Sequence, residues 1–406
     1  MARYMTYTEA ADLGPYVRLL MLEEPTPMDR GLLGATTFEV RSRAAGSADD
    51  VAVPVLRAFA CDAAGEPVGE GALQTAPYVA LELPECDATR LVGGNLMGSF
   101  RVRREFRVKQ SGPADSVTFD VPAGDRCPAL DGWDLGLSGT FDGYGLRYAL
   151  FSPKAVAPGG TPLLLWLHGA GEPRDPYLSV MANRVTALGL PRIQRELGGA
   201  AYVLAPASPT YWMDSGSGMM EDDNQSRYTA ALRQLVDSVI AAHPDVDRRR
   251  IYVGGLSNGG FMTCRLIADY PGYFAAGVAL CAPWNEDLAT EEEFRALAGT
   301  PLWFVHSKDD PIVDPNRTAI PNFRRLRAMG APDVHLTLLD HVVDQTGRYL
   351  DEQGRPRRFN GHFVWIPTYN DLIRETCEDP ATQVGDGALT LWKWVGSRKL
   401  SAPGGH

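Results

Sequence analysis

The chain has 406 residues, which is enough for more than one domain and for a sizeable hydrophobic core. Hydrophobic residues make up 45% of it and charged residues 22%, a balance typical of soluble globular proteins rather than of disordered or fibrous ones. With 39 basic and 50 acidic side chains the formal charge is −11, so we expect no nucleic-acid partner, because an acidic surface repels phosphate groups.

The N-terminal residues do not have the pattern of a secretory signal. The apolar stretch 17–22 is short, is interrupted by Arg18 and follows Glu9 and Asp12, whereas a signal needs a basic start and a longer apolar run. No uninterrupted apolar stretch reaches the roughly 20 residues that cross a bilayer. We therefore predict a cytoplasmic protein without a membrane partner, and a secreted chain that has been trimmed stays open as the alternative.

Residues 1–135 favour β structure. Short β-rich runs alternate with turn-forming residues such as Gly46-Ser47 and Gly93-Gly94, and no long amphipathic helix pattern separates them. The runs are 37–40, 51–60, 78–83, 100–108 and 117–121. This spacing predicts a small antiparallel β-sandwich domain, followed by a connector over the Pro- and Gly-containing stretch 122–143.

Residues 136–400 favour a second, α/β domain. Short apolar runs suit central strands of a sheet that is covered on both faces: 163–167, 202–205, 251–254, 276–280, 302–305 and 334–339. Helical patterns lie between them, and the clearest covers 228–242, where apolar residues recur at helical spacing. The alternation of strands and helices predicts a mostly parallel sheet flanked by helices.

The segment 251–260 contains the pattern G-x-S-x-G as Gly255, Ser257 and Gly259. It follows an apolar strand directly and precedes a helical run directly, and this strand–turn–helix setting is more specific than the pattern alone. A sharp turn of this kind holds a serine hydroxyl above the sheet of an α/β-hydrolase fold. Ser257 is therefore the predicted nucleophile, and an ordinary serine in a Gly-rich turn is the alternative.

An earlier strand ends in the sequence Leu167-His168-Gly169-Ala170-Gly171-Glu172. Acyl transfer needs two donors for the oxygen that becomes negative, and in this fold they are the amide after the nucleophile and an amide of this earlier loop. We predict the amides of Asn258 and Ala170. His168 precedes the nucleophile in the chain, so we expect it to have a structural role, and we assign no chemistry to Glu172.

In this fold the acid and the base follow the serine in the chain, in that order. Asp310 is the predicted acid because it follows the strand 302–305 and immediately precedes the segment 311–313; Asp309 and then Asp314 are the alternatives. His362 is the predicted base because it lies in a loop, after Gly361 and before aromatic residues. The alternatives for the base fall at less suitable places: His341 just after a strand, His335 within it and His406 at the terminus.

Four segments, 167–172, 255–260, 306–313 and 362–369, together resemble bacterial serine esterases related to polyhydroxybutyrate depolymerases and feruloyl esterases. The likeness is strongest to the esterases that carry an N-terminal immunoglobulin-like domain. This resemblance implies carboxylester hydrolysis by the residues named above, and an immunoglobulin-like fold for residues 1–135. It also favours His362 over His341, because the histidine of that family stands shortly before a tryptophan, as His362 does before Trp365.

We therefore predict a serine carboxylesterase that acts on a short-chain or aryl ester and uses no metal or organic cofactor. The six cysteines lack C-x-x-C spacing, which argues against a zinc site, and we expect reduced thiols. Trp212 and Trp284 follow strand ends and are the predicted substrate-binding aromatics. Homo-oligomer formation stays open. The alternative functions are a peptidase of the prolyl oligopeptidase type, which normally carries propeller repeats absent here, and a glycan- or protein-binding protein with a relic hydrolase domain.

Overall fold

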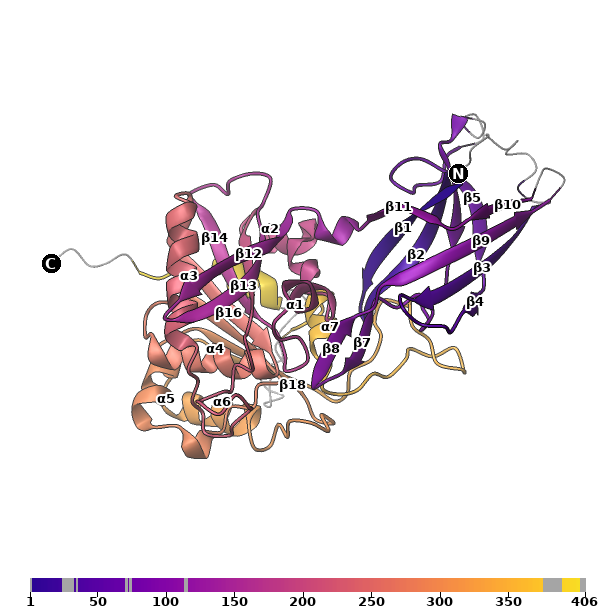
Figure 1. The fold of residues 1–406 in the computed structure, drawn as a ribbon. Coiled ribbons are helices and arrows are strands. Elements are labelled where there is room, and N and C mark those ends of the chain that lie inside the picture. The colour runs from indigo at the N-terminus through magenta and orange to yellow at the C-terminus, as the bar shows by residue number, and fades with distance from the viewer. Residues whose placement is uncertain are drawn as a thin grey trace. The chain divides into compact units, whose positions relative to one another are not determined.

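The computed structural model describes residues 2–23, 33, 36–69, 72, 75–112, 116–374 and 389–401. The chain divides into two compact units, and Figure 1 shows the elements of each. The first unit comprises residues 1–94 and 99–131, and the second comprises residues 95–98 and 132–406. The expected domain boundary at residue 135 stays a proposal.

The first unit is built from two β-sheets. A five-stranded sheet has the order β11-β1-β2-β6-β5 and a four-stranded sheet the order β10-β9-β3-β4, while β7 and β8 form a separate pair. All neighbours are antiparallel except β1 and β11. The strands are β1 (Arg3–Ala11), β2 (Gly14–Glu23), β3 (Thr37–Ala44), β4 (Val51–Val53), β5 (Arg57–Cys61), β6 (Tyr78–Glu82), β7 (Val92–Asn95), β8 (Gly98–Arg101), β9 (Arg104–Ser111), β10 (Val117–Phe119) and β11 (Val121–Arg126).

The two sheets of the first unit share one hydrophobic core. Leu20 of the first sheet belongs to the same buried cluster as Val40, Val108 and Phe119 of the second. Along β9 every second residue is buried, as expected for a strand with one face on a core. The β-rich character of this unit is thereby confirmed, and its likeness to an immunoglobulin domain stays a proposal.

Strands β1 and β2 are absent from the sequence-based prediction. Arg18 interrupts the apolar run in β2, so the sequence of this run does not show the continuous apolar pattern of a buried strand. In the structure the Arg18 side chain is paired with Glu9 of β1 and Glu82 of β6, at 3.4 and 3.7 Å. The charge is thus neutralised between neighbouring strands, and such pairing depends on the sheet order rather than on the local pattern.

The second unit is an eight-stranded mixed sheet flanked by helices. Its strand order is β12-β13-β15-β14-β16-β17-β18-β19. In this order, all neighbouring strands from β15 to β19, including β14, are parallel. β12 pairs with β13 and β13 with β15 in antiparallel fashion, which forms one edge of the sheet. The strands are β12 (Trp133–Phe141), β13 (Tyr144–Phe151), β14 (Thr161–Leu167), β15 (Tyr202–Ala207), β16 (Val246–Leu256), β17 (Ala276–Leu280), β18 (Leu302–Ser307) and β19 (Val334–Leu339).

This arrangement confirms the predicted α/β-hydrolase fold class. β14, β15, β17 and β18 are buried along their whole length, as the continuous apolar runs indicate. The α-helices are α1 (Pro176–Met181), α2 (Pro191–Glu196), α3 (Thr229–Ala242), α4 (Asn258–Asp269), α5 (Glu291–Ala298), α6 (Ala319–Ala328), α7 (Trp365–Tyr369) and α8 (Leu391–Ser397), with short 3₁₀ turns η3 (Pro128–Leu130), η4 (Val185–Gly189) and η5 (Glu286–Leu288).

The boundary between the two units, after Asp131, falls within the predicted connector 122–143, but this stretch is not a plain loop. This stretch contains most of β11 and all of β12. β12 is an edge strand whose residues alternate between half-buried and exposed, and it includes Gly136 and Gly139. Because it carries no fully buried residue, its sequence lacks the apolar signal of a strand.

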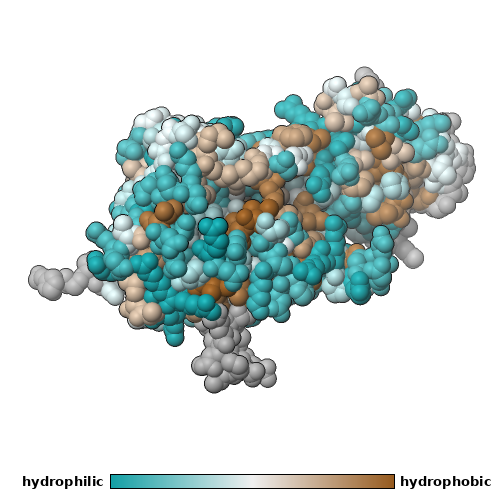
Figure 2. Space-filling view, turned by 90° about the horizontal axis from the view of Figure 1, so that it is seen from below, coloured by the Kyte–Doolittle hydropathy of each residue, from teal (hydrophilic) through white to brown (hydrophobic). Residues whose placement is uncertain are grey.

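On the face shown in Figure 2, hydrophilic residues predominate and hydrophobic ones gather in separate patches. No helix among the described residues is long and apolar enough to cross a membrane. The cysteines at positions 61, 86, 127, 264 and 281 are free thiols, and Cys377 lies outside the described residues.

Candidate active site

Ser257 lies at a strained turn between β16 and α4. Its backbone has φ 54° and ψ −116°, which is unusual for a residue with a side chain and persists only where the surrounding structure holds it in place, often at functional sites. The turn is tight: a Cβ at Gly255 would lie 2.5 Å from the carbonyl oxygen of Leu167. The Ser257 amide donates to the carbonyl of Leu280 at 2.8 Å, which fixes the turn against β17.

The Ser257 side chain is half-buried, and within the described part of the chain its hydroxyl has no hydrogen bond. It lines a cavity of about 230 Å³ that His362 also lines. Catalytic hydrogen bonds are often long or poorly aligned before substrate binds. The strained turn therefore presents a hydroxyl to the same cavity as an imidazole.

The two predicted oxyanion residues also line this cavity. Ala170 comes from the loop after β14, and Asn258 is the first residue of α4, where amides have no partner within the helix. The Asn258 side chain accepts a hydrogen bond from the amide of Trp212 at 2.6 Å. This bond ties the start of α4 to the loop after β15.

His168 anchors the loop after β14, which contains the predicted oxyanion residue Ala170. Its ring Nδ1 lies 2.6 Å from the Gly169 carbonyl, and its Nε2 accepts from the Ser208 amide at 3.0 Å. A carbonyl only accepts and an amide only donates, so the ring is neutral with its proton on Nδ1. Burial lowers the pKa of His168 to about 4, which also keeps it neutral. The expectation of a structural role agrees with this geometry.

The structure brings Asp310 and His362 together. Nδ1 of the imidazole lies 2.7 Å from Oδ2 of the carboxylate, and both side chains are buried. The other carboxylate oxygen accepts from the amides of Ile312 and Val313 at 2.8 and 3.0 Å. Asp310 is thereby held at both oxygens in the loop after β18.

His306 is a neighbour of the acid that sequence reasoning left without a role. This penultimate residue of strand β18 places its Nε2 3.0 Å from Oδ2 of Asp310 and 2.9 Å from the Val313 carbonyl. Burial opposes ionisation of Asp310, but the hydrogen bonds with His306 and His362 outweigh it and hold the Asp310 pKa well below its ordinary value. The carboxylate is therefore ionised at neutral pH.

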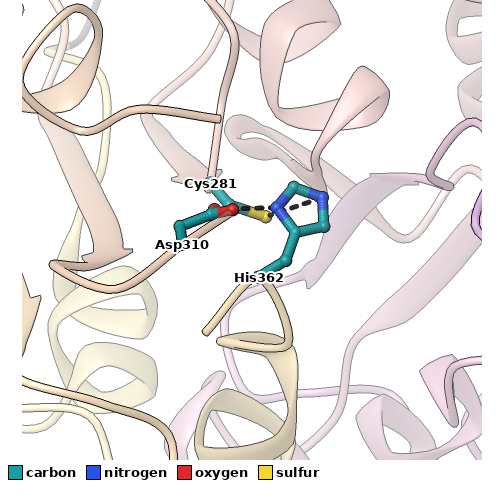
Figure 3. A group of neighbouring side chains, drawn as sticks. All are labelled: Cys281, Asp310 and His362. Carbon is teal, nitrogen blue, oxygen red and sulfur yellow. Dashed lines mark hydrogen bonds and ion pairs between the residues drawn. The ribbon is translucent and has the colours of Figure 1, made fainter. Parts of the chain in front are cut away.

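Cys281, directly after β17, is a second neighbour of the imidazole. Figure 3 shows its sulfur close to both the His362 ring and the carboxylate of Asp310, and the sulfur lies 4.0 Å from Nε2. Burial alone would lower the pKa of His362, yet its contact with Cys281 and the bond to Asp310 raise it above its ordinary value. No sequence pattern links Cys281 to His362, since 81 residues separate them.

Within the described part of the chain, these three side chains form a group that could hold a metal ion. Their ligand atoms lie within 4.8 Å of one another, and all three residues are buried. However, Asp310 and His362 are already bonded to each other through the atoms that would bind the ion. The hydrogen bonds account for the cluster without a metal.

The alternative acids and bases have other partners or positions. Asp309 accepts from Ser307 and Arg358, and Asp314 closes a turn with Asn316. His341 is exposed, and His335 is bonded to Asp333 at 2.8 Å. His406 lies outside the described residues.

The cavity wall is apolar with acidic groups. Met213 and Met220 of the loop after β15 line it together with Ile312, Val313 and Trp365. Its acidic residues are Glu172, Glu221 and Asp222, and the described lining residues include no lysine or arginine. The volume suits a short acyl chain or a single ring more than a long chain.

The structure does not bring Trp212 and Trp284 into this cavity. Both indole rings are fully buried in the core of the second unit, and neither is among the described lining residues. Trp212 stacks beside His168, and Trp284 lies beside Phe261 of α4. Met213, next to Trp212, and Pro283, next to Trp284, line the cavity wall instead.

The chain is similar to a known protein family and to solved structures. Residues 159–320, which are less than half of the chain, match the model of the phospholipase/carboxylesterase family of α/β-hydrolases. The solved structure of a thermostable esterase superimposes with a TM-score of 0.74 over 98% of this chain and 99% of that one, at 22% sequence identity. The expected resemblance to α/β-hydrolase esterases is thereby confirmed at the level of the fold.

Two curated plant proteins are similar over a shorter stretch. Both are described as probable glutamyl endopeptidases of the chloroplast, from Arabidopsis thaliana, 31% identical over 157 residues, and from Oryza sativa subsp. japonica, 28% identical over 168 residues. Each match covers 36% of this chain and 16% of the plant protein. The comparisons together support hydrolase chemistry and leave open which bond is cleaved.

Proposed function

We propose that the chain is a serine carboxylesterase that hydrolyses short-chain or aryl esters through an acyl-enzyme. The observation that carries the proposal is the strained Ser257 turn opening into the cavity that His362 lines, with Asp310 bonded to the far nitrogen of that ring. A serine, a histidine and an ionised carboxylate in these roles are the parts of a serine hydrolase.

In the proposed reaction the Ser257 Oγ attacks the ester carbonyl carbon while its proton passes to Nε2 of His362. The amides of Ala170 and Asn258 donate to the oxygen that becomes negative. The intermediate collapses as the carbon–oxygen bond to the alcohol breaks, and the imidazolium returns the proton to that alcohol. Water then attacks the acyl-enzyme by the same route and releases the carboxylic acid.

Asp310 contributes by staying ionised. Its bond to Nδ1 fixes the tautomer that leaves Nε2 free to accept a proton, and its charge stabilises the imidazolium that forms. His306 bonds to the same oxygen, Oδ2, and so helps the acid to keep its orientation when the base becomes charged.

The proposal extends to the rest of the chain. Residues 1–135 would form an immunoglobulin-like domain and residues 136–400 the catalytic domain. The partner is a small-molecule ester, and the chemistry requires no cofactor. A cavity of about 230 Å³ with methionine and isoleucine side chains supports a short acyl or aryl group.

The test compares wild type with Ser257→Ala on p-nitrophenyl acetate and butyrate. We expect the variant to lose at least about a thousandfold in kcat, because the acyl-enzyme cannot form. Ser238→Ala is the matched control, since Ser238 lies on α3 and bonds only to a carbonyl of its own helix. Wild-type turnover by Ser257→Ala would exclude the serine mechanism, and a fluorophosphonate probe should label the Ser257 peptide alone.

Peptide hydrolysis is the second candidate, since the plant proteins with similar sequences are described as endopeptidases. The acidic cavity lining disfavours a glutamyl side chain, because like charges repel. Assays with p-nitroanilides of glutamate and alanine separate the two functions. Faster cleavage of these anilides than of the matched esters would favour a peptidase over an esterase. No turnover of either class would favour a binding protein with an inactive hydrolase domain.

A further inference from the structure

Glu172 is a buried carboxyl group that the proposed mechanism does not use. It lies in the loop after β14, two residues beyond Ala170, and is only 5% exposed. It nevertheless lines the cavity that Ser257 and His362 line. Its Oε2 atom has no hydrogen-bond partner within the described part of the chain. A buried polar atom without a partner is costly, so its retention requires an explanation.

The known neighbours of the carboxyl group satisfy it only in part. Burial raises the pKa of Glu172 to about 7, while hydrogen bonds with the Asn183 side chain and the Gly169 backbone, and the charge of His362, act in the opposite direction. Asn183 also lines the cavity. The protein thus satisfies the carboxyl group in part, and the residue lies in the wall of the cavity.

The free oxygen lies next to the reacting centre. A Cβ placed on Gly169 would be 3.2 Å from Oε2 of Glu172 and 2.8 Å from the Leu256 side chain. Gly169 is adjacent to Ala170, and Leu256 is adjacent to Ser257. Oε2 therefore lies beside the two segments that supply the proposed oxyanion donor and nucleophile.

The other acidic residues of the lining do not duplicate this position. Glu221 accepts from the hydroxyl and the amide of Ser215, at 2.5 and 2.9 Å, which occupies one of its oxygens within its own loop. Asp222 is exposed to solvent. Among the described lining residues, Glu172 is the carboxyl group that combines burial with an oxygen lacking a partner.

We propose that Glu172 is a specificity-determining residue that binds a hydrogen-bond donor of the substrate, an ammonium or hydroxyl group close to the ester carbonyl. The proposal deepens the proposed esterase function and rests on it. A substrate donor would satisfy the buried oxygen, whereas an apolar group at that place would leave it without a partner. Sites built to bond a polar group reject analogues that lack it for this reason.

The test uses three p-nitrophenyl esters of one branched skeleton: alanine, lactate and isobutyrate. They place an ammonium, a hydroxyl or a methyl group at the same position. We expect kcat/KM of wild type to be about 10- to 100-fold higher for at least one donor-bearing ester than for isobutyrate, after correction for spontaneous hydrolysis, since a bond to a charged or buried group has this effect. Comparing alanine with lactate identifies which donor is preferred.

Glu172→Gln should remove this preference while leaving isobutyrate hydrolysis within about threefold of wild type, because the amide keeps the shape of the side chain. Asp222→Asn is the control, since it removes an exposed lining charge and should preserve the preference. An equal loss on all three esters would show that Glu172 only positions the oxyanion loop and would overturn the proposal. The absence of any wild-type preference would overturn it as well.

A binding measurement separates this inference from the esterase function. The methyl esters of alanine, lactate and isobutyrate are titrated calorimetrically into Ser257→Ala and into Ser257→Ala with Glu172→Gln. Tighter binding of a donor-bearing ester only when Glu172 is present supports the inference even if wild type hydrolyses no ester. Equal binding of all three esters to Ser257→Ala contradicts it, whatever the wild-type activity.

Discussion

Gly361 determines how closely the loop of the proposed base approaches the loop of the proposed acid. A Cβ at position 361 would lie 2.7 Å from both the backbone carbon and the carbonyl oxygen of Asp309. Ordinary contacts of a Cβ begin at about 3.4 Å, so Gly361→Ala requires the two loops to separate by about 0.7 Å. Backbone atoms cannot rotate away as a flexible side chain can.

The separation acts on the next residue, His362, and on its 2.7 Å bond to Asp310. A displacement approaching 1 Å costs on the order of 100-fold in rate when reacting groups must be aligned. We therefore expect Gly361→Ala to lower kcat about 10- to 100-fold with little change in KM. The free energy of unfolding should fall by about 1 to 3 kcal/mol, as is usual for overpacking.

The assay is steady-state hydrolysis of p-nitrophenyl acetate, together with urea unfolding to measure stability. Gly216→Ala is the matched control, because nothing lies within 4 Å of a Cβ there and its loop belongs to the same unit. Gly216→Ala should retain wild-type kcat. If Gly361→Ala also keeps the wild-type kcat, the close approach of these loops does not position the imidazole and the reasoning is wrong.

Three further outcomes follow from the contacts around the imidazole. Cys281→Ala should move the acid limb of kcat/KM to lower pH, because the contact with Cys281 raises the pKa of His362 and the base must be neutral to act. A limb that stays in place or moves to higher pH would contradict this, and Cys264→Ala should leave the profile unchanged. His306→Asn should lower kcat about tenfold with KM unchanged, since Asp310 loses a hydrogen-bond donor, and stopped-flow kinetics that show unchanged acylation would refute it. Folding lowers the pKa of Asp310, so its carboxylate stabilises the folded state above a pH of about 4, and this contribution is lost as the pH falls further. In urea unfolding, Asp310→Asn should therefore lose less stability in acid than wild type does.

The sequence by itself determines the features that depend on neighbouring residues. The uninterrupted apolar run 276–280 predicts β17 with the observed bounds, because a strand buried on both faces needs apolar side chains throughout. The turn around Ser257 is equally local, since a strand, a G-x-S-x-G pattern and a helix follow one another within 20 residues or so. The same reasoning does not predict edge strand β12 or strand β2, which contains Arg18, because the stability of these strands depends on their neighbours in the sheet.

Only the tertiary structure decided which distant side chains meet. It brings Cys281 to Nε2 of His362 and Asp310 to Nδ1, although they are 81 and 52 residues away in the chain. It also brings His306 to Oδ2 of Asp310. It also buries Trp212, which local pattern reasoning assigned to the substrate. The physical reason is that a side chain's exposure and charge state depend on what packs against it from other elements, and that information is not contained in any single segment.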